Sequence, residues 1–513
     1  MNKPDGPDLD AGIDITTIPE GTMVTGCWRG KPVLLANDRG SYCAVSPTCT
    51  HMGAPLNEGI LANGEIHCPW HHARFSLATG AATGAPAFSP LTRFETSVRN
   101  GRLFVTDEAH LRVECADAVP TPKVVILGAG AGGYACADWL ARCGFGAATT
   151  VVSDDVDPPY DRTYCSKQYL IGMKSRAQSL IAGPPALQNE SAGPALRLDC
   201  KVRAIDTRHK SIVLDAQERI PYDVLVLAMG AEPQRPQWPG FDLPNVHVLR
   251  TLRDADAIIR ACLQAKHVAV VGASFIGLEV AASLKQRKLE VHVVSREDLP
   301  LKKRFGSDVG KMIQAVHEEK GVCFHLGREV RRFDGRQLLL DDGSEIQTDF
   351  VVIGMGVRPR TELAQDAGIA CATVAEGSGI IVNDRLESSC TDIFAIGDVA
   401  RYPDPHTGKH IRVEHWVHAQ RQGQHVARVI MNQATRFTDV PFFWSAHFDT
   451  GLLYLGHVES ILQMRTEGSI QARNFGRHYQ GPDGEKAFVT CNRDKDALIE
   501  EAAWDRSLGQ NDR

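Results

Sequence analysis

The sequence lacks a long hydrophobic run and a targeting segment. No stretch approaches the roughly 18 uninterrupted apolar residues that a membrane-spanning helix needs. The first ten residues are polar and contain three Asp. They have neither the basic-then-apolar layout of a signal peptide nor the Arg- and Ser-rich character of a transit peptide. We therefore expect a cytoplasmic protein with no membrane partner.

The sequence also lacks long runs of basic residues. The chain has 513 residues and a formal net charge of -6, and its basic residues gather only in short runs such as Lys302-Lys303-Arg304. A nucleic-acid-binding surface normally needs clustered Lys and Arg. Nucleic acid is therefore excluded as a main partner. The length, with 43% hydrophobic residues, predicts about three or four globular domains.

Paired cysteines are missing as well. The 14 cysteines are scattered from Cys27 to Cys491, with no Cys-x-x-Cys or Cys-x4-Cys pair of the disulfide-reductase kind. A disulfide framework is therefore not expected, and most of the thiols should be reduced and buried. The cysteines with histidine neighbours are the candidates for chemistry.

Two such pairs lie in the first hundred residues. Residues 13–106 consist of short β-rich segments separated by turn residues, which predicts a small all-β domain. Two of its loops carry Cys49-Thr50-His51 and Cys68-Pro69-Trp70-His71. In a Rieske [2Fe-2S] centre two Cys hold one iron and two His hold the other. We therefore predict Cys49, His51, Cys68 and His71 as cluster ligands.

A structural Cys2His2 zinc site is the alternative for the same four residues. Such sites usually pair the cysteines as Cys-x2-4-Cys and the histidines as His-x3-5-His, whereas each loop here mixes the two types. The mixed pattern and the loop prolines Pro55 and Pro69 favour the iron–sulfur cluster.

A glycine-rich turn after the β domain predicts a dinucleotide-binding module. The strand expected over 123–127 runs into Gly128, Gly130 and Gly133 and then a helical pattern, and a second strand over 149–152 is followed by Asp154. In such βαβ units the glycines let a pyrophosphate approach the helix N-terminus, and an acid after the second strand binds a ribose.

The same arrangement recurs with a strand over 267–271, the glycines Gly272 and Gly277, a helix, and a strand over 291–294. Two dinucleotide folds in one chain predict two bound dinucleotides. The apolar strand that runs into Gly397-Asp398 indicates a return to the first module.

The first domain resembles the ferredoxin-type Rieske domains over 49–56 and 68–80. Respiratory Rieske proteins add a disulfide between the ligand loops, but the matching positions here are Ala54 and Trp70. The resemblance therefore implies a potential toward the lower end of the roughly -150 to +300 mV Rieske range. His72 stands where the family generally has Gly, and we expect its side chain to crowd the loop or to add a titrating group.

The rest of the chain resembles the FAD-dependent pyridine-nucleotide reductases. The motifs that carry this resemblance lie, in family order, at 159–162, 166–167, 354–356, 414–416 and 443–445. They are similar to those of the oxygenase-coupled ferredoxin reductases and the apoptosis-inducing-factor-like (AIF-like) proteins. The Rieske-containing AIF-like subgroup resembles this chain over essentially its whole length.

This resemblance implies roles for individual residues. By this resemblance Asp398 contacts the flavin ribityl chain and Arg162 contacts FAD. Trp444 is either an ordinary core aromatic residue or a neighbour of the flavin. The implied catalytic residues, near or along the flavin ring, are Lys167, Glu414, His415 and Trp416. The implied cofactor-binding residues are Gly128, Gly130, Gly133, Asp154, Arg162, Lys167, Val202, Asp398, Trp416, Gly272, Ser274, Gly277, Glu279, Ser295, Arg296 and Gly356.

Two positions depart from the family pattern. The usual Ala-Thr-Gly is Ala228-Met229-Gly230, which removes a hydroxyl near the FAD phosphates. Ser295 and Arg296 replace the acid that would bind the ribose 2′-OH, and Arg can accommodate a 2′-phosphate. We therefore expect NADPH to be used at least comparably with NADH. Because Glu297 is only two residues from Ser295, use of NADH is not excluded.

These assignments predict an NAD(P)H-dependent FAD oxidoreductase. Electrons would pass from nicotinamide through FAD to the Rieske [2Fe-2S] cluster, because a hydride carries two electrons and the cluster accepts one. An external acceptor protein, which could be an oxygenase, a cytochrome or a ferredoxin, would receive them. The oligomeric state stays open, a homodimer included. Two alternatives are a flavin peroxidase or oxidase that uses Cys165 and a redox-responsive AIF-like signalling protein.

The expected fold is multidomain. A small all-β Rieske domain precedes an α/β flavoprotein with Rossmann-like FAD and NAD(P) domains, and an α+β domain ends the chain. The expected boundaries are 1–108 for the Rieske domain, 109–121 for a linker, 122–240 and 361–435 for the FAD-binding domain, 241–360 for the NAD(P)-binding domain and 436–513 for the C-terminal domain.

Overall fold

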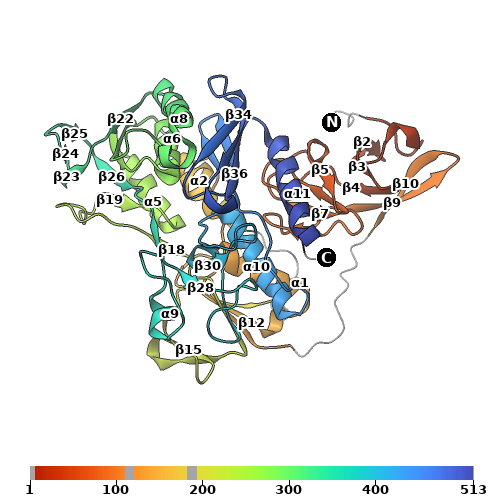
Figure 1. The fold of residues 1–513 in the computed structure, drawn as a ribbon, viewed down its shortest axis with the longest axis horizontal. Helices are drawn as coiled ribbons and strands as arrows, with labels where there is room; N and C mark the ends of the chain where they lie inside the picture. The colour runs from red at the N-terminus through yellow and green to blue at the C-terminus, as the bar shows by residue number, and fades with distance from the viewer. Residues whose placement is uncertain (1–5, 110–120, 182–192, 512–513) are drawn as a thin grey trace.

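The computed structural model describes residues 6–109, 121–181 and 193–511. These residues form four sheets of five or six strands and several smaller ones. In Figure 1 the N-terminal β region lies at one side and the C-terminal helix α11 separates it from the C-terminal sheet, while the two α/β units lie on the other side and below. The expected linker falls at residues 110–120, outside the described residues.

Two antiparallel sheets form the N-terminal region. They pack on two small cores, one around Phe75 and Leu56 beneath the expected cluster loops and one around Trp28 and Phe94. The six-stranded sheet has the order β1 (Ile13–Asp14), β10 (Arg102–Ala109), β9 (Arg93–Arg99), β4 (Ser41–Val45), β3 (Lys31–Asp38) and β2 (Met23–Trp28). The four-stranded sheet contains β5 (Ile60–Ala62), β6 (Glu65–His67), β7 (Arg74–Ser76) and β8 (Ala82–Gly84).

A parallel sheet forms the core of the first α/β unit. Its central strand β11 is buried along its whole length and β17 along all but its first residue, as expected when helices and loops cover both faces. The strand order is β13 (Ala195–Arg197), β12 (Thr149–Val152), β11 (Val124–Leu127), β17 (Val224–Leu227) and β29 (Ile393–Ala395). Helix α1 (Ala131–Arg142) follows β11 and packs against α10 (Trp416–Ile430).

The second α/β unit repeats this design. Its sheet has the order β19 (Val246–Val248), β26 (Phe350–Ile353), β20 (His267–Val271), β21 (Glu290–Ser295) and β22 (Val322–Leu326), all parallel. The helices are α5 (Leu252–Cys262), α6 (Phe275–Gln286) and α8 (Ser307–Glu319). Helices α6 and α8 bury apolar side chains against one face of the sheet, so the strand, glycine turn and helix predicted from the sequence are all present.

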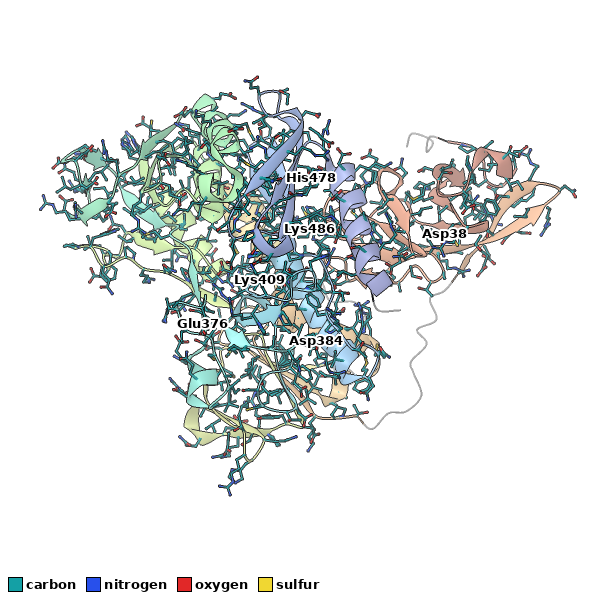
Figure 2. The ribbon with its side chains drawn as sticks, in the orientation of Figure 1. Asp38, Glu376, Asp384, Lys409, His478 and Lys486 are labelled. Atoms are coloured by element: carbon teal, nitrogen blue, oxygen red, sulfur yellow. The ribbon has the colours of Figure 1, made fainter. Side chains whose placement is uncertain are left out.

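The C-terminal region is an antiparallel sheet with one helix. The order is β32 (Phe442–His447), β33 (Thr450–His457), β36 (Lys486–Cys491), β35 (Asn474–Gln480) and β34 (Gln463–Ser469), followed by α11 (Asp494–Asn511). Two side chains labelled in Figure 2 join the sheet to α11: His478 lies 3.9 Å from Glu500, and the Lys486 ammonium lies 4.4 Å from the Trp504 ring centre. A third labelled side chain, Lys409, bonds Glu485 at 2.9 Å and so ties the first α/β unit to this sheet.

The remaining strands and helices are short. The short strands are β14 (Val202–Asp206), β15 (Ser211–Leu214), β16 (Arg219–Pro221), β18 (Ala231–Pro233), β23 (Val330–Phe333), β24 (Gln337–Leu340), β25 (Glu345–Gln347), β27 (Val357–Pro359), β28 (Ile380–Ile381), β30 (Ala400–Pro403) and β31 (His410–Ile411). The short helices are α2 (Gln168–Ile171), α3 (Arg176–Ser179), α7 (Lys302–Phe305) and α9 (Glu362–Asp366).

The fold class expected from the sequence is confirmed: a small all-β region comes first, two α/β units follow with the second inserted before strand β29 of the first, and an α+β region comes last. Within the described ranges, no helix has the length and apolar character needed to cross a membrane.

Candidate functional site

Two loops of the N-terminal region present the predicted cluster ligands. They have the same backbone pattern: Cys49 N donates to Ala54 O at 2.9 Å, and Cys68 N donates to Ala73 O at 2.8 Å. The Cys49 and Cys68 side chains are 3% and 1% exposed, and their sulfur atoms are in contact. This contact raises the pKa of Cys49, and burial raises it further. The same contact lowers the pKa of Cys68, as for two thiols that share a proton.

The two histidines lie beside each other at the same place. The rings of His51 and His71 have their centres 5.0 Å apart. Both ring nitrogens of His51 and Nδ1 of His71 are buried and have no hydrogen-bond partner among the described residues. Buried polar atoms are nearly always partnered, so these nitrogens indicate a bound group.

The donor set fits a [2Fe-2S] cluster better than a single metal ion. Among the described residues no three His, Cys, Asp or Glu side chains are placed to hold one ion. A Rieske cluster needs only two protein ligands on each iron, and the cysteine pair and the histidine pair supply them. A four-ligand zinc site would need all four to converge on one ion.

A cavity of 1210 Å³ lies between the two α/β units and the C-terminal sheet. It exceeds the usual size of a small-ligand pocket, about 300–1,000 Å³. At the turn after β11, a Cβ on Gly133 would lie 1.9 Å from Gly128 O, so only glycine allows this close packing of helix and strand. Gly130 instead faces open space, and the nearest atom to an added Cβ belongs to Arg162 at 3.9 Å. The cradle at the start of α1 therefore fits a pyrophosphate.

Most of the predicted site residues line this cavity. Those that do are Gly128, Gly130, Asp154, Arg162, Lys167, Val202, Ser274, Glu279, Gly356, Asp398, Glu414, His415 and Trp416. The others lie behind or outside its walls: Gly133, Gly272, Gly277, Ser295 and Arg296. Gly133 and Gly277 pack beneath the two turns, whereas Ser295 and Arg296 stand at the end of β21, where a second dinucleotide would extend.

An ion pair with a buried acid and a partly exposed lysine lies in the cavity wall. Lys167 Nζ donates to Glu279 Oε2 at 2.7 Å, and Ser166 Oγ donates to the same oxygen at 2.6 Å. Lys167 precedes α2, while Glu279 lies on α6 of the second unit. The pair therefore joins the two units where the cavity narrows between them.

Three cations that no sequence motif marked also line the cavity. Arg250 bonds Asp398 at 2.7 Å, Arg360 bonds Asp154 at 2.7 Å, and Arg412 bonds Glu414 at 2.5 Å. Isolated arginines outside a motif carry no signal in the sequence that would have predicted them. Each of them neutralises one acid of the cavity wall.

Glu414, His415 and Trp416 lie at the start of α10. Desolvation by the cavity wall raises the pKa of the Glu414 carboxyl, and Arg412 partly offsets this. His415 packs against Phe443 with ring centres 4.3 Å apart, and burial holds the pKa of its imidazole well below the ordinary value. A neutral imidazole and two aromatic rings therefore make up this part of the wall.

The cluster loops and the cavity share a wall. Trp444 lines the cavity, and its ring centre lies 4.3 Å from that of His71. The other histidine, His51, has Nε2 at 3.7 Å from Asp161 Oδ2 of the first α/β unit. The two predicted ligand histidines therefore face the α/β units, and one tryptophan separates His71 from the cavity.

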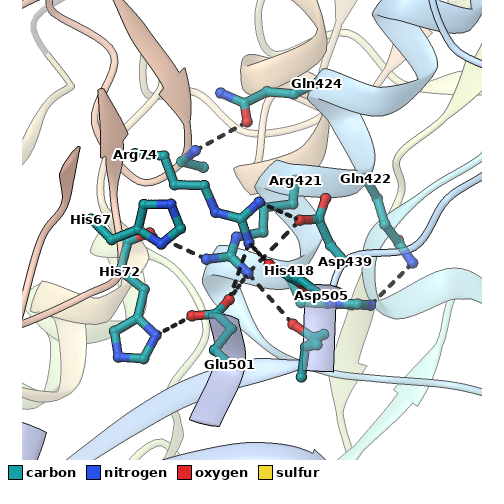
Figure 3. A network of polar contacts seen from close by, with 12 residues as sticks. His67, His72, Arg74, His418, Arg421, Gln422, Gln424, Asp439, Glu501 and Asp505 are labelled. Atoms are coloured by element: carbon teal, nitrogen blue, oxygen red, sulfur yellow. Dashed lines mark hydrogen bonds and ion pairs between the residues drawn. The ribbon is translucent and has the colours of Figure 1, made fainter. Parts of the chain in front are cut away.

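His72 neither crowds the cluster loop nor faces the cluster. Its ring stacks on Phe442 at 4.0 Å and contacts Glu501 of α11 (Figure 3). Glu501 also bonds Arg421 of α10 at 2.6 Å and Arg74 of β7 at 3.3 Å, and Arg421 donates to the backbone oxygen of His72 at 3.2 Å. Buried charges thus hold the N-terminal region against the rest of the chain.

Cys165 also lines the cavity, but it is not a reactive thiolate. The residue is 2% exposed, and burial raises the pKa of its thiol to about 12, with Arg162 opposing. Reactive cysteines need a depressed pKa and some exposure. The geometry therefore does not support a peroxidase or oxidase that uses Cys165.

Comparisons with known proteins agree with this geometry. Residues 122–423 match the pyridine nucleotide-disulphide oxidoreductase family, and residues 13–95 match the Rieske [2Fe-2S] domain. Human apoptosis-inducing factor 3 is 28% identical over 482 residues, which span 90% of this chain and 78% of that protein. Rhodocoxin reductase of Rhodococcus erythropolis is 33% identical over 358 residues, or 69% of this chain and 82% of that protein.

A solved structure shows the same likeness. The covalent putidaredoxin reductase-putidaredoxin complex matches with a TM-score of 0.69 and 27% identity, over 75% of this chain and 92% of that one. The two family models imply FAD, a nicotinamide nucleotide and a [2Fe-2S] cluster, and the cavity and the ligand loops fit these groups. The chain therefore belongs to the pyridine nucleotide-disulphide oxidoreductase family, as an NAD(P)H-dependent flavoprotein oxidoreductase with an N-terminal Rieske domain.

Proposed function

We propose that the Rieske centre is the built-in electron outlet of the reductase and passes single electrons to an external acceptor protein. The observation that carries this is the contact of His71 with Trp444, which puts a predicted cluster ligand against the cavity wall. In the putidaredoxin reductase complex, a separate protein is joined to a reductase. Here a Rieske domain is part of the same chain.

FAD, when bound, accepts a hydride from the nicotinamide and gives up its electrons one at a time, and a [2Fe-2S] cluster, when bound, carries one electron. We propose Cys49, Cys68, His51 and His71 as cluster ligands. Gly128, Gly130, Gly133, Asp154, Arg162, Val202, Asp398 and Trp416 would hold FAD, and Gly272, Ser274, Gly277, Glu279, Ser295, Arg296 and Gly356 would hold the nicotinamide nucleotide. Lys167, Glu414, His415 and Trp416 would line the flavin ring.

The docking place of the acceptor follows from the orientation of the cluster loops. His51 and His71 face the α/β units, so an acceptor has to approach from elsewhere. Trp70 belongs to the second cluster loop, is 39% exposed, and has its ring centre 6.5 Å from that of His71. We place the acceptor, which could be an oxygenase component, a cytochrome or a ferredoxin, at this exposed ring.

We also propose NADPH as a substrate alongside NADH. Arg296 is exposed and has no ion-pair partner among the described residues, whereas the nearby Glu297 is neutralised by Lys303 at 2.9 Å. A free guanidinium beside a paired carboxylate favours a 2′-phosphate. Arg296→Glu should weaken NADPH use at least tenfold more than NADH use in steady-state kcat/KM. A wild-type preference for NADH of several hundredfold would rule this out.

We also propose the domain limits expected from the sequence, with the Rieske domain at residues 1–108. Deletion of that domain would expose the buried Arg421 and Glu501, so a point variant is the sharper test. Cys68→Ser should retain flavin reduction by NAD(P)H and turnover with two-electron acceptors, while reduction of a one-electron protein acceptor should collapse.

The matched control is Cys43→Ser, which changes a half-buried thiol of the same domain outside the ligand loops. It should behave like the wild type. Full-rate reduction of the protein acceptor by Cys68→Ser would show that the cluster is not on the electron path, and a sensory role for the Rieske domain would then be the better explanation.

A further inference from the structure

The two predicted ligand histidines have different neighbours outside the Rieske domain. The ring of His71 packs against Trp444 of the C-terminal sheet. Nε2 of His51 instead lies 3.7 Å from Oδ2 of Asp161, which belongs to the first α/β unit and precedes the segment that leads to Lys167. One histidine therefore faces an aromatic ring, and the other faces a carboxylate.

The contact between His51 and Asp161 is shielded from water. Their side chains are 10% and 9% exposed. Met52, the next residue of the cluster loop, packs against the same apolar core as Tyr160 and Tyr164 on either side of Asp161. A charge in such surroundings is screened much less than one at the surface. The carboxylate therefore acts on the His51 ring with little screening.

Asp161 is held in place by bonds that leave one of its carboxylate oxygens to His51. The residue precedes the short helical turn Arg162–Ser166, and its Oδ1 accepts from Thr163 N at 2.9 Å and from Thr163 Oγ1 at 2.6 Å. Its backbone N donates to Ser179 O at 2.9 Å. A helix cap needs only one side-chain oxygen, so capping does not account for Oδ2.

The ring nitrogens of the histidines fit this arrangement. Nδ1 of His51 and Nδ1 of His71 are both buried and have no hydrogen-bond partner among the described residues. Because Nε2 of His51 faces Asp161, Nδ1 is the nitrogen left for an iron ion. A histidine that binds a metal commonly has a carboxylate at its other ring nitrogen, which fixes the tautomer and tunes the metal. The 3.7 Å separation is that of an ion pair and is longer than a hydrogen bond.

We propose that Asp161 is a positioning residue for His51 and lowers the reduction potential of the Rieske cluster. The inference rests on the cluster ligands of the proposed function. Reduction adds one electron to the cluster, and a negative charge nearby makes this addition less favourable. Net charge and hydrogen bonds around an iron–sulfur cluster set its potential. The first α/β unit therefore tunes a cluster whose four ligands all lie in the Rieske domain.

The test uses two neutral variants of the full-length holoenzyme, Asp161→Asn and Asp161→Ser. Asn and Ser cap helices about as well as Asp, so both variants keep the turn and lose only the charge. The cluster potential is measured by redox titration with mediator dyes, followed by the EPR signal of the reduced cluster. Both variants should bind the electron about three- to tenfold more tightly than the wild type, where tenfold corresponds to about 59 mV for one electron.

Asp14→Asn is the matched control, because Asp14 caps a helical turn through the same contacts. Its Oδ1 accepts from Thr16 N at 2.9 Å and from Thr16 Oγ1 at 2.7 Å. Asp14 is exposed and lies on β1, at the edge of the six-stranded sheet. The control should keep the wild-type potential. An unchanged potential in both Asp161 variants, or an equal shift in Asp14→Asn, would overturn the proposal and leave Asp161 as a helix cap.

A second readout shows whether Asp161 acts through His51. Pulsed EPR of the reduced cluster, in protein labelled with 15N-histidine, resolves the couplings of the ligand histidines. In Asp161→Asn the coupling to the nitrogen that does not bind iron should change for one histidine and stay the same for the other. Unchanged couplings for both histidines would contradict a role of Asp161 at His51.

These measurements fail separately from the proposed function. The potential and the couplings are equilibrium properties of the cluster and do not depend on turnover. Full-rate reduction of the protein acceptor by Cys68→Ser would overturn the electron path and leave the effect of Asp161 in place. A wild type that binds zinc instead of iron at the four ligands would overturn both.

Discussion

Two buried glutamates, Glu279 and Glu501, differ in their neighbours and teach what buried charge does in this protein. Glu279 has one cation, Lys167, and two hydroxyls, Ser166 and Ser445. Glu501 contacts two guanidiniums and an imidazole, those of Arg421, Arg74 and His72 (Figure 3). Glu279 therefore has one charged partner, in the cavity wall, whereas Glu501 joins charged groups of the N-terminal region to α10.

The electrostatics of Glu501 agree with this difference. Burial opposes ionisation of Glu501, but Arg421, His72 and Arg74 together hold the pKa of its carboxyl well below the ordinary range. Its partners come from α10 and from the loop and strand that follow the second cluster motif. We infer that the ion pairs of Glu501 with His72, Arg74 and Arg421, here called the lock, fix the position of His71 against Trp444. Glu279 instead lines the cavity.

Glu501→Ala tests the lock and should have the largest effect. It leaves Arg421, which is 2% exposed, without its main partner, and removal of one partner of a buried ion pair costs about 3–5 kcal/mol. We expect the free energy of unfolding, measured by denaturant titration, to fall by that amount. Flavin reduction by NAD(P)H should persist while reduction of a one-electron protein acceptor falls, because His71 is no longer fixed against Trp444.

Asp496→Ala on the same helix is the control. Its pair with Arg493 at 3.3 Å is at the surface, where a salt bridge contributes about 0–1 kcal/mol. Equal losses of stability in Asp496→Ala and Glu501→Ala would remove the distinction between lock and surface pair.

Glu279→Gln tests the other glutamate and should have a smaller effect on stability. Glutamine keeps the shape and a hydrogen-bond acceptor for Ser445, and Lys167 lines the cavity, where water can reach it. We expect a loss of about 1–2 kcal/mol in the free energy of unfolding. Flavin reduction by NAD(P)H should slow, because Lys167 loses its charged partner in the cavity wall. A Glu279→Gln enzyme that loses stability as Glu501→Ala does, at unchanged rates, would show that both glutamates are structural.

The sequence predicted the parts of the molecule that short motifs hold. Cys49 with His51 and Cys68 with His71 each lie within one loop, so local spacing alone places each pair. The glycine turns are likewise local, since strand, turn and helix follow one another within about 20 residues. Each of these features lies within one βαβ unit or one loop, and their order along the chain predicted the fold class.

The lock could not be predicted in this way. Two of its residues, Glu501 and Arg421, are 80 residues apart. None of its residues belongs to a spacing pattern with a known chemical meaning. His72 was expected to disturb the cluster loop, but its direction depends on the packing of α11 against the N-terminal region, which no local pattern contains.

Asp505→Asn tests the edge of the lock and should have the smallest effect. Asp505 bonds Arg74 at 3.0 Å, but burial and the carboxylates of Glu501 and Asp439 raise its pKa to about 7 against the pull of Arg74. The folded state therefore binds a proton more readily than the unfolded chain, where the pKa is near 3.8. Stability from this group is complete below about pH 4 and is lost as the pH rises to about 7.

Asparagine does not titrate, so the variant should lack this loss. We expect the free energy of unfolding of the wild type to fall between pH 5 and pH 7.5 relative to that of Asp505→Asn. The slope should stay well below the one-proton limit of about 1.4 kcal/mol per pH unit, because the Asp505 side chain is partly exposed and water screens its charge. Below about pH 4.5 both proteins should weaken together, because the depressed pKa of Glu501 makes its contribution disappear as the pH falls. Parallel pH profiles of the two proteins from pH 5 to pH 7.5 would show that Asp505 is ionised throughout, and that the lock carries one more negative charge than we infer.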